Sequence, residues 1–556
     1  MKKEILVQSA IVIVLLLLIS IPAVKSLFIP GGFTAHDLTH HVVRQISMDK
    51  LLSEGQFPPR WSGELNNGYG YPVFLFNYPL PALLGEVFHE LGMGYVTAVK
   101  AVLFSSMILS ILGMYLFLKS LLGSKLAPFL GAVFYLYAPI RFLNVYVSAS
   151  VGSALGAAIL PFVFWSMVEI SKQRKWAFLS GGLFFGLLIL AHNVTTLVFT
   201  PLILTFATYL VWQSKNRGRV FSNLAGTLLL GLALSAWFWL PAIIEKQYII
   251  FDSVFGDFYK SQFVSFYQLL RSPWGYGLSH PQNPEPGDMS YQLGLIHFLV
   301  IVLLAVCLIF IKNLRILGGF VLIFFWGSVF LMLKISLPLW ENLGFLSLIQ
   351  FPLRFSALAV FTSSIAAAIL VKYLPFKKSV FMGLLLLVLY ANRNHWHINE
   401  VFDPGKDYYL NHKTTTASYN EHLPKWGRAM EKRTGPKLEF VGGGGNVQIT
   451  KDYSGLVLAE VEATTSSKLR LNQFYFPGWQ IKVDNQEKDF NYLIDGESYG
   501  LMVFDISSGK HIVLAEFKNI PLRNLADFIS LTSVVLWIGL LCKLLMPHLF
   551  TIKKSS

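Results

Sequence analysis

The sequence is poor in charge and in cysteine. Only 14% of its 556 residues are charged, whereas average soluble domains carry about 25%, and this shortage excludes an ordinary soluble enzyme. Only two cysteines are present, Cys307 and Cys542, and both lie in apolar runs. No disulfide framework therefore stabilises the polar segments.

Hydrophobic residues make up 54% of the chain and aromatic residues 15%, which excludes a disordered protein. Apolar runs of about 20 residues recur along the sequence, and runs of that length can cross a bilayer as helices. The sequence therefore predicts a multi-pass α-helical membrane protein with about twelve spans. The predicted spans are residues 5–24, 95–118, 126–140, 150–170, 176–192, 194–212, 221–244, 292–311, 316–333, 354–371, 379–393 and 525–546.

The net charge of +14 follows from the short links between these runs. With the N-terminus inside, each cytoplasmic link carries at least two Lys or Arg and no Asp or Glu: residues 119–125, 171–175, 214–219, 312–315, 372–378 and the tail from 547. This pattern is the positive-inside rule. It predicts a plasma-membrane protein with both termini cytoplasmic, and it argues against nucleic acid as a partner.

The larger polar segments then lie outside the cell, so we expect function on that side. Three of these segments, residues 25–94, 245–291 and 334–353, are external loops of a transmembrane domain that comprises residues 1–393. Residues 394–524 alternate apolar and polar side chains between turn signals, which predicts an extracytoplasmic β-sandwich of about seven or eight strands. Residues 525–556 form the last span and a basic cytoplasmic tail.

The first external loop has the densest group of ionisable residues. From Thr34 onward the helical periodicity gathers His36, Asp37, His40 and Arg44 on one side of a surface helix. Thr34 and Asp37 fit a capping box, in which Asp37 would only cap the helix. The alternative is that Asp37 acts as a general base, with a histidine or Arg44 tuning its pKa or holding an anion.

His36 and His40 also have the i, i+4 spacing of metal ligands. With Asp37 as a third ligand they would form a divalent-metal site. The simpler interpretation is a pair of interfacial histidines that contact headgroups or backbone carbonyls.

Gly and Pro enforce turns in the next segments of this loop, 61–72 and 76–81, which are rich in aromatic side chains. Such residues form the aromatic belt of many membrane proteins. They could equally form a wall for a sugar or an isoprenoid chain, with Trp61, Tyr69, Tyr71 and Tyr78 as the candidates.

Other ionisable residues fall at the outer ends of predicted spans: Arg141, His192, Glu245 and Arg354. Most of these positions are typical of interfacial anchors or helix caps. Arg354 is the best candidate for binding phosphate, because arginine holds phosphate oxygens with a planar fork and Pro352 restricts the backbone before it.

Several short motifs carry a resemblance. They are His36-Asp37-Leu38, Gly68-Tyr69-Gly70-Tyr71-Pro72, Tyr78-Pro79-Leu80, His192-Asn193, Gln350-Phe351-Pro352-Leu353-Arg354-Phe355, Leu423-Pro424-Lys425-Trp426, Tyr475-Phe476-Pro477-Gly478-Trp479 and Gly509-Lys510-His511. In this order they resemble the bacterial 6-pyruvoyl-tetrahydropterin synthase-related membrane proteins, over nearly the whole chain. Those proteins are similar to the YfhO-like and GT-C superfamily of membrane glycosyltransferases.

The resemblance implies transfer of a hexosyl or pentosyl group from a polyprenyl-phosphate-linked sugar to a glycan, lipid or protein acceptor. Asp37 matches the loop acid that deprotonates the acceptor. Arg354 is the candidate for donor phosphate binding, with Arg44 and His192 as helpers. Many GT-C enzymes carry a second acid, for which Glu64 and Glu86 are candidates.

Two other functions fit parts of the sequence. A lipid or polysaccharide transporter would place polar residues along a path through the spans, yet few ionisable residues are predicted there, His297 being an exception. A noncatalytic envelope protein would bind glycan through its β-sandwich and use Asp37 only as a cap.

Overall fold

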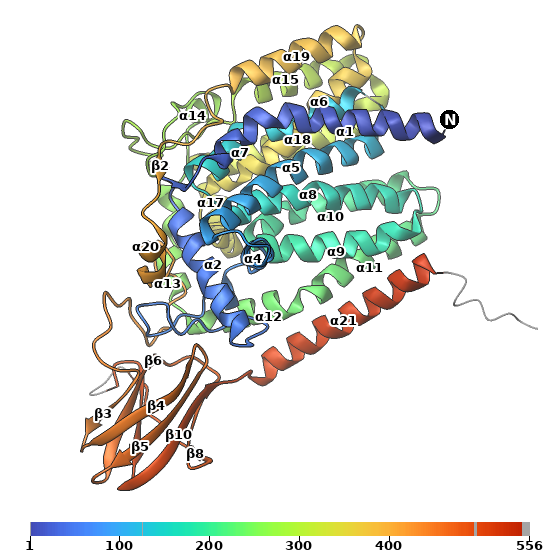
Figure 1. The fold of residues 1–556 in the computed structure, drawn as a ribbon. Helices are drawn as coiled ribbons and strands as arrows, with labels where there is room; N and C mark the ends of the chain where they lie inside the picture. Colours follow the sequence, from blue (N-terminus) through green and yellow to red (C-terminus); the bar gives the residue numbers. More distant parts are fainter. Residues whose placement is uncertain (1, 125, 494–497, 547–556) are drawn as a thin grey trace, which may run out of the picture.

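The computed structural model describes residues 2–124, 126–493 and 498–546, with side chains from residue 10 onward. A bundle of long helices carries a strand-rich domain at one end (Figure 1). We call this end the loop end, because α2 (Leu38–Ser53) and α4 (Leu80–Glu90) of the first loop also lie there. The predicted basic tail, 547–556, lies outside the described residues.

The helices occupy all twelve predicted segments, but they differ in length. Within the described residues, seven are long and apolar enough to cross a membrane, or up to nine if each of two bent pairs is one span. The chain is therefore a multi-pass membrane protein, and the number twelve stays a prediction. The seven are α1 (Lys2–Val24), α5 (Tyr95–Leu122), α8 (Val151–Ser171), α10 (Asn193–Gln213), α16 (Arg315–Met332), α18 (Ser356–Tyr373) and α21 (Pro521–Leu545).

The bent pairs and the shorter helices fill the remaining segments. One pair joins α6 (Leu126–Leu136) to α7 (Pro139–Phe142) and the π-turn η2 (Leu143–Val147), and the other joins α11 (Arg217–Leu234) to α12 (Ala236–Ile244). The shorter helices are α9 (Lys175–Ala191), α15 (Leu295–Phe310) and α19 (Lys377–Ala391).

The centre of the bundle is built from α18, α8 and α5. In their most apolar windows, 89% of α18 and 83% of α8 are buried, against 11% of α21. α5 packs on α8 and α6, and α18 packs on α6, α15 and α16. The exposed apolar surface of α21 is what a helix at the lipid boundary requires.

The bends leave backbone groups that need partners. Between α11 and α12 the chain turns by 74°. Ser530 of α21 bridges this break, because its Oγ accepts from the Trp237 N–H and donates to the Ala233 carbonyl. Between α6 and α7 the bend is 50°, and Pro139 at the start of α7 has no N–H to leave unsatisfied.

The β domain consists of two antiparallel sheets. One has the strand order β4-β5-β10-β7-β8 and the other β3-β6-β9. Inward side chains of both sheets, among them Val461, Leu469, Phe504 and Val513, belong to one hydrophobic cluster. The strands are β3 (Leu438–Gly442), β4 (Gly445–Tyr453), β5 (Leu456–Ala463), β6 (Ser467–Phe474), β7 (Trp479–Val483), β8 (Gln486–Lys488), β9 (Leu501–Ile506) and β10 (Gly509–Phe517).

Residues 394–437 do not belong to these sheets. Near their start, β2 (Val401–Phe402) pairs with β1 (Gly32–Phe33) of the first loop. Further on, Ala417 and Leu423 pack in a cluster with Leu51 of α2. The predicted external domain thus begins with a segment that lies along the loop end of the bundle.

The first loop anchors the β domain. Trp61 is fully buried, its Nε1 donates to Oε1 of Gln473 at 2.9 Å, and its ring packs against Phe476 and Phe517. Arg60 donates to Oδ1 of Asn519. The aromatic residues of this loop therefore bury a contact between two parts of the chain.

Three of the four side chains predicted to form a substrate wall belong to this contact, so that prediction does not hold for them. Besides Trp61, they are Tyr69, whose ring packs against Phe474, and Tyr71, whose hydroxyl accepts from the His422 N–H. Both tyrosines are at most 2% exposed. No apolar face remains on them for a ligand.

Candidate active site

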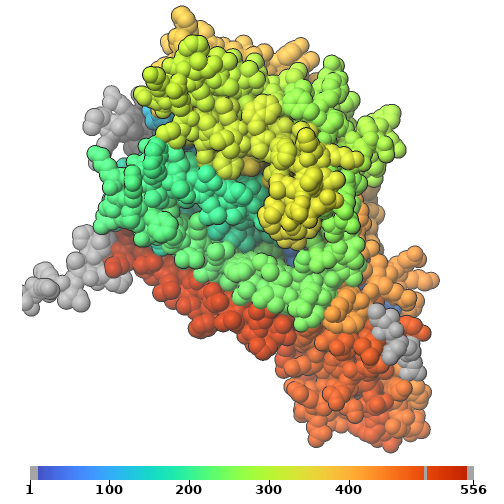
Figure 2. All heavy atoms as spheres, turned by 180° about the vertical axis from the view of Figure 1, so that it is seen from behind, coloured from blue at the N-terminus to red at the C-terminus, as the bar shows by residue number. Residues whose placement is uncertain are grey.

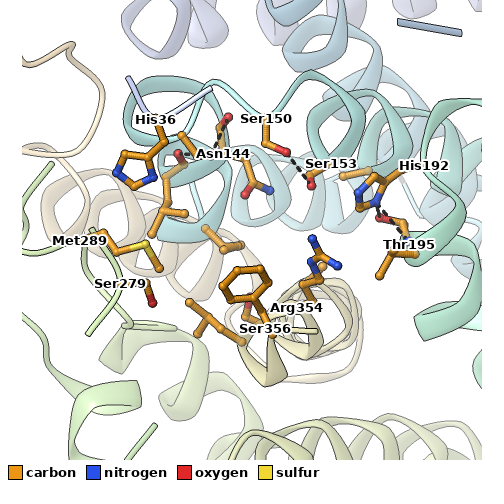
Figure 3. A pocket seen from close by; sticks show the side chains of 18 of the residues that line it. His36, Asn144, Ser150, Ser153, His192, Thr195, Ser279, Met289, Arg354 and Ser356 are labelled. Carbon is orange, nitrogen blue, oxygen red and sulfur yellow. Dashed lines mark hydrogen bonds between the residues drawn. The ribbon is translucent and has the colours of Figure 1, made fainter. Parts of the chain in front are cut away.

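A cavity of about 490 Å³ opens at the loop end of the bundle. It brings together Asp37, His192 and Arg354, which lie far apart in the sequence. Figure 3 shows His192 and Arg354 on one side of this space and His36 on the other. On the face shown in Figure 2, the surface is hollowed between the yellow residues that follow α16 and the teal helices beside them. The three residues therefore converge on one cavity.

Asp37 stands at the N-cap position of α2, which begins at Leu38. Its backbone N–H donates to the Ser148 carbonyl, and its side chain makes no capping hydrogen bond. The capping box predicted for Thr34 and Asp37 is therefore wrong, because the helix starts three residues later than that motif requires. The carboxylate lines the cavity.

Burial raises the pKa of the Asp37 carboxyl above its ordinary value. The charges of Arg44, His36 and Arg354 oppose this effect, and Glu421 adds to it. A carboxylate with a raised pKa binds a proton more readily than an exposed one, which is what a general base needs.

Arg354 lies on η8 (Pro352–Phe355), directly before α18. Its Nη1 donates to the Ile349 carbonyl at 2.8 Å, and its guanidinium lies 5.2 Å from the Phe351 ring centroid. Among the described residues, no carboxylate lies within 4.0 Å of it. The remaining N–H groups are therefore available to an anion in the cavity.

His192 occupies the junction of α9 and α10. Its Nδ1 accepts from the Thr195 N–H at 3.1 Å and so caps α10. Because Nδ1 accepts this hydrogen bond, the proton of the neutral ring resides on Nε2. The ring also meets Tyr78 edge-on, with centroids 4.9 Å apart. His192 therefore offers one N–H donor on the same side of the cavity as Arg354 (Figure 3). Tyr78, the fourth residue of the predicted substrate wall, is not among the residues that line this cavity.

Other predicted site residues have partners away from the cavity. Arg44 donates from Nε to Oγ1 of Thr416 at 3.2 Å, and it acts on Asp37 only through its charge. Glu64 accepts from Ser47 and from Ser454 at the contact with the β domain. Glu86 accepts from Gln45 at 2.7 Å. Neither glutamate is a second acid for Asp37.

The predicted metal ligands do not converge. His36 Nε2 lies 2.9 Å from the Gly277 carbonyl, and His40 faces His412 with ring centroids 6.5 Å apart. Across the described ranges, one group of three ligand side chains has mutually close atoms, namely Asp49, Glu86 and Glu90, and it lies outside the cavity. The arrangement does not fit a metal held by His36, Asp37 and His40.

The sequence alone does not assign two further ionisable residues, Glu421 and Arg141, to the site. Glu421 is close enough for its charge to act on Asp37 and Arg354, although it follows the last predicted span of the bundle by many residues. Arg141, which looked like an interfacial anchor, lines the cavity. Hydroxyl and amide groups of Asn144, Ser150 and Ser153 face the same space (Figure 3).

No family model matches the chain, so the 6-pyruvoyl-tetrahydropterin synthase-related label gains no support. A curated relative, an uncharacterised protein of Lactococcus lactis subsp. cremoris, is 26% identical over 245 residues. The match covers 42% of this chain and 40% of that protein. The chain therefore spans less than half the length of this relative.

Three solved structures are similar at low identity. ArnT from Cupriavidus metallidurans, bound to undecaprenyl phosphate, matches with 14% identity over 69% of this chain and 62% of its own, at a TM-score of 0.36. The mycobacterial arabinofuranosyltransferase AftD has 14% identity, coverages of 72% and 28%, and a TM-score of 0.43. The apo oligosaccharyltransferase of Archaeoglobus fulgidus has 13% identity, coverages of 76% and 61%, and a TM-score of 0.42. Two of these three proteins are glycosyl-transferring enzymes by name.

Proposed function

We propose that the protein is a membrane glycosyltransferase of GT-C type that uses a polyprenyl-phosphate-linked sugar. The observation that carries this proposal is the shared cavity of Asp37 and Arg354. One is a carboxylate with a raised pKa and no capping bond. The other is a cation without an acidic partner among the described residues. Base and phosphate binder are the two groups that such a transfer needs.

In this reaction Asp37 removes the proton from an acceptor hydroxyl. The hydroxyl oxygen forms a bond to the anomeric carbon of the sugar, and the bond from that carbon to the phosphate oxygen breaks. The lipid phosphate leaves with one more negative charge, and Arg354 with the Nε2–H of His192 stabilises that charge. The proton stays on Asp37 until the product departs.

The polar residues around these groups suit a sugar. Asn144, Ser150 and Ser153 offer hydroxyl and amide groups on one wall, and such groups can hydrogen-bond sugar hydroxyls. The cavity also has apolar lining residues, among them Val198, Phe199 and Val360. We assign the reaction to the outer face of the membrane, as the basic links predict.

The test is a transfer assay with the purified protein in proteoliposomes. Labelled polyprenyl-phosphate hexoses and pentoses are supplied with envelope extracts as acceptors. The expected result is labelled acceptor and an equal amount of free lipid phosphate. Movement of intact donor across the bilayer without cleavage would indicate a transporter, and the absence of both would leave a noncatalytic binding protein.

A further inference from the structure

Arg141 is a buried cation without an acidic partner. It lies directly after the bend between α6 and α7 and is 2% exposed. Within the part of the chain that the structure describes, Nε and Nη1 have no hydrogen-bond partner. Nη2 meets only the Met107 sulfur, at 4.0 Å, and the guanidinium lies 5.5 Å from the Tyr135 ring centroid. Neither neighbour neutralises the charge.

Such a position is costly for a free protein. A guanidinium does not lose its proton, so burial cannot be relieved by titration. An unpaired charge inside a membrane helix bundle is expensive, and such residues mark ligand or ion pathways. The missing partner is therefore expected to come from outside the chain.

Ser356 is a second buried polar residue of this cavity that lacks a partner in the described part of the chain. It is 1% exposed, its Oγ has no partner among the described residues, and it lines the cavity together with Arg141. Ser356 follows Arg354 by two residues at the start of α18 (Figure 3). A group held by Arg141 and Ser356 would thus adjoin the group held by Arg354.

We propose that Arg141 and Ser356 form a second anion-binding subsite in this cavity, for a phosphate or carboxylate that the substrate carries besides the phosphate at Arg354. The proposal rests on the function proposed above and adds to it the class of donor. A second phosphate would make the donor a lipid diphosphate. A carboxylate would make the sugar an acidic one.

The experiment measures binding to the full-length protein in nanodiscs. The probes are a short-chain polyprenyl monophosphate, the corresponding diphosphate, and free glucuronate. Wild type should bind either the diphosphate more tightly than the monophosphate or the glucuronate measurably. Arg141→Gln should weaken the binding of the diphosphate or the glucuronate by roughly tenfold or more, as expected for the loss of hydrogen bonds to a charged group. The same variant should keep the wild-type affinity for the monophosphate.

The outcomes separate the two proposals. Monophosphate binding that depends on Arg354 but not on Arg141 tests the proposed function alone. If Arg141→Gln binds all probes as wild type does, or if no probe binds in a manner that depends on Arg141, the second subsite is overturned. A gain for the diphosphate assigns a phosphate, and a gain for glucuronate assigns a carboxylate.

A second variant, Arg141→Met, tests the subsite even if Arg141→Gln folds poorly. Because the charge has no partner in the free protein, Arg141→Met should leave the Tm unchanged or raise it while abolishing the anion effect. The matched control is Lys100→Met. Lys100 is a buried cation whose Nζ donates to the Ile29 and Gly31 carbonyls, so its loss should lower the Tm and leave anion binding intact. A lowered Tm for Arg141→Met with unchanged anion binding would make Arg141 a structural residue.

Discussion

Arg523 and Glu245 form an ion pair that is closed to solvent on both sides. Nη2 of Arg523 lies 2.6 Å from Oε2 of Glu245, Nε lies 2.9 Å from Oε1, and both side chains are 0% exposed. Arg523 also donates to the Pro477 carbonyl. The pair therefore ties the end of α12 and the start of α21 to the β domain.

Breaking this pair from one side should be severe. Glu245→Gln leaves a buried guanidinium without its counter-charge, and a change of this kind costs roughly 3–5 kcal/mol of stability. Replacing both partners, Glu245→Leu with Arg523→Met, should recover most of the loss. Thermal unfolding of the purified variants measures this. Equal losses in the single and double variants would mean that packing, not charge, holds the junction.

Asp37→Asn should fold normally and transfer poorly. Asn keeps the shape of the side chain but cannot accept the proton, so the rate should fall by about 10²–10⁴-fold while donor binding persists. Asp49→Asn is the matched control, since Asp49 lies on the same helix but outside the cavity. Near-normal transfer by Asp37→Asn would remove Asp37 from the reaction.

The pH dependence of stability should single out Asp37 as well. Because its folded pKa is raised, the native state holds this proton more tightly than the unfolded chain. The contribution of Asp37 to stability therefore falls as pH rises from the ordinary aspartate value through the raised pKa. Above that window Asp37→Asn should be at least as stable as wild type. A lower Tm of the variant at neutral pH would argue for a structural role of the carboxylate.

The raised pKa of Asp37 also determines the direction in which the transfer rate changes with pH. The base must be ionised, so the transfer rate should rise with pH through the raised pKa of Asp37. A rate profile measured with saturating donor reports this pKa in the bound state.

Arg354→Lys should weaken donor binding more than it slows the chemical step. Lysine keeps the charge but loses the planar fork, so KM should rise with a smaller change in kcat, and Arg354→Gln should lower both further. Arg393 offers a matched control: it donates to the Tyr390 carbonyl at 2.7 Å and stacks on that ring, but it does not line the cavity. If Arg393→Gln raises KM as strongly, the effect is a general loss of positive charge.

Orientation can be tested with single cysteines in a background without Cys307 and Cys542. Ser466 and Lys215 are both exposed, the first in the turn between β5 and β6 and the second between α10 and α11. In intact cells an impermeant thiol reagent should label Ser466→Cys and leave Lys215→Cys unmodified. The reverse pattern would invert the topology.

The sequence predicted the helices better than their breaks. Long apolar runs such as the one that became α18 are unmistakable, because a bilayer demands about 20 apolar residues in a row. The turn at Ser235 is not visible in that signal, since its partner, Ser530, lies in a helix almost 300 residues later. Long-range partners of this kind leave no local trace.

In the site, too, the sequence predicts features with a local signal and misses features that depend on distant partners. The sequence indicates His192 and Arg354 because each is a polar residue at the end of an apolar run. It indicates Asp37 because this residue belongs to the densest group of ionisable residues in the first loop. Trp61, Tyr69 and Tyr71 were assigned to a substrate wall because an aromatic residue that anchors a domain has the same local pattern as one that binds a ligand. Arg141 was passed over because the absence of a partner is a property of its surroundings and not of its neighbours in the chain.

The contact between the first loop and the β domain has a consequence for biosynthesis. Trp61 and its partner Gln473 are 412 residues apart, and Asp527, to which Arg60 donates, follows later still. A ribosome delivers the first loop long before either partner exists. The first loop, which carries Asp37, can therefore reach its final packing against the β domain only when translation is almost finished.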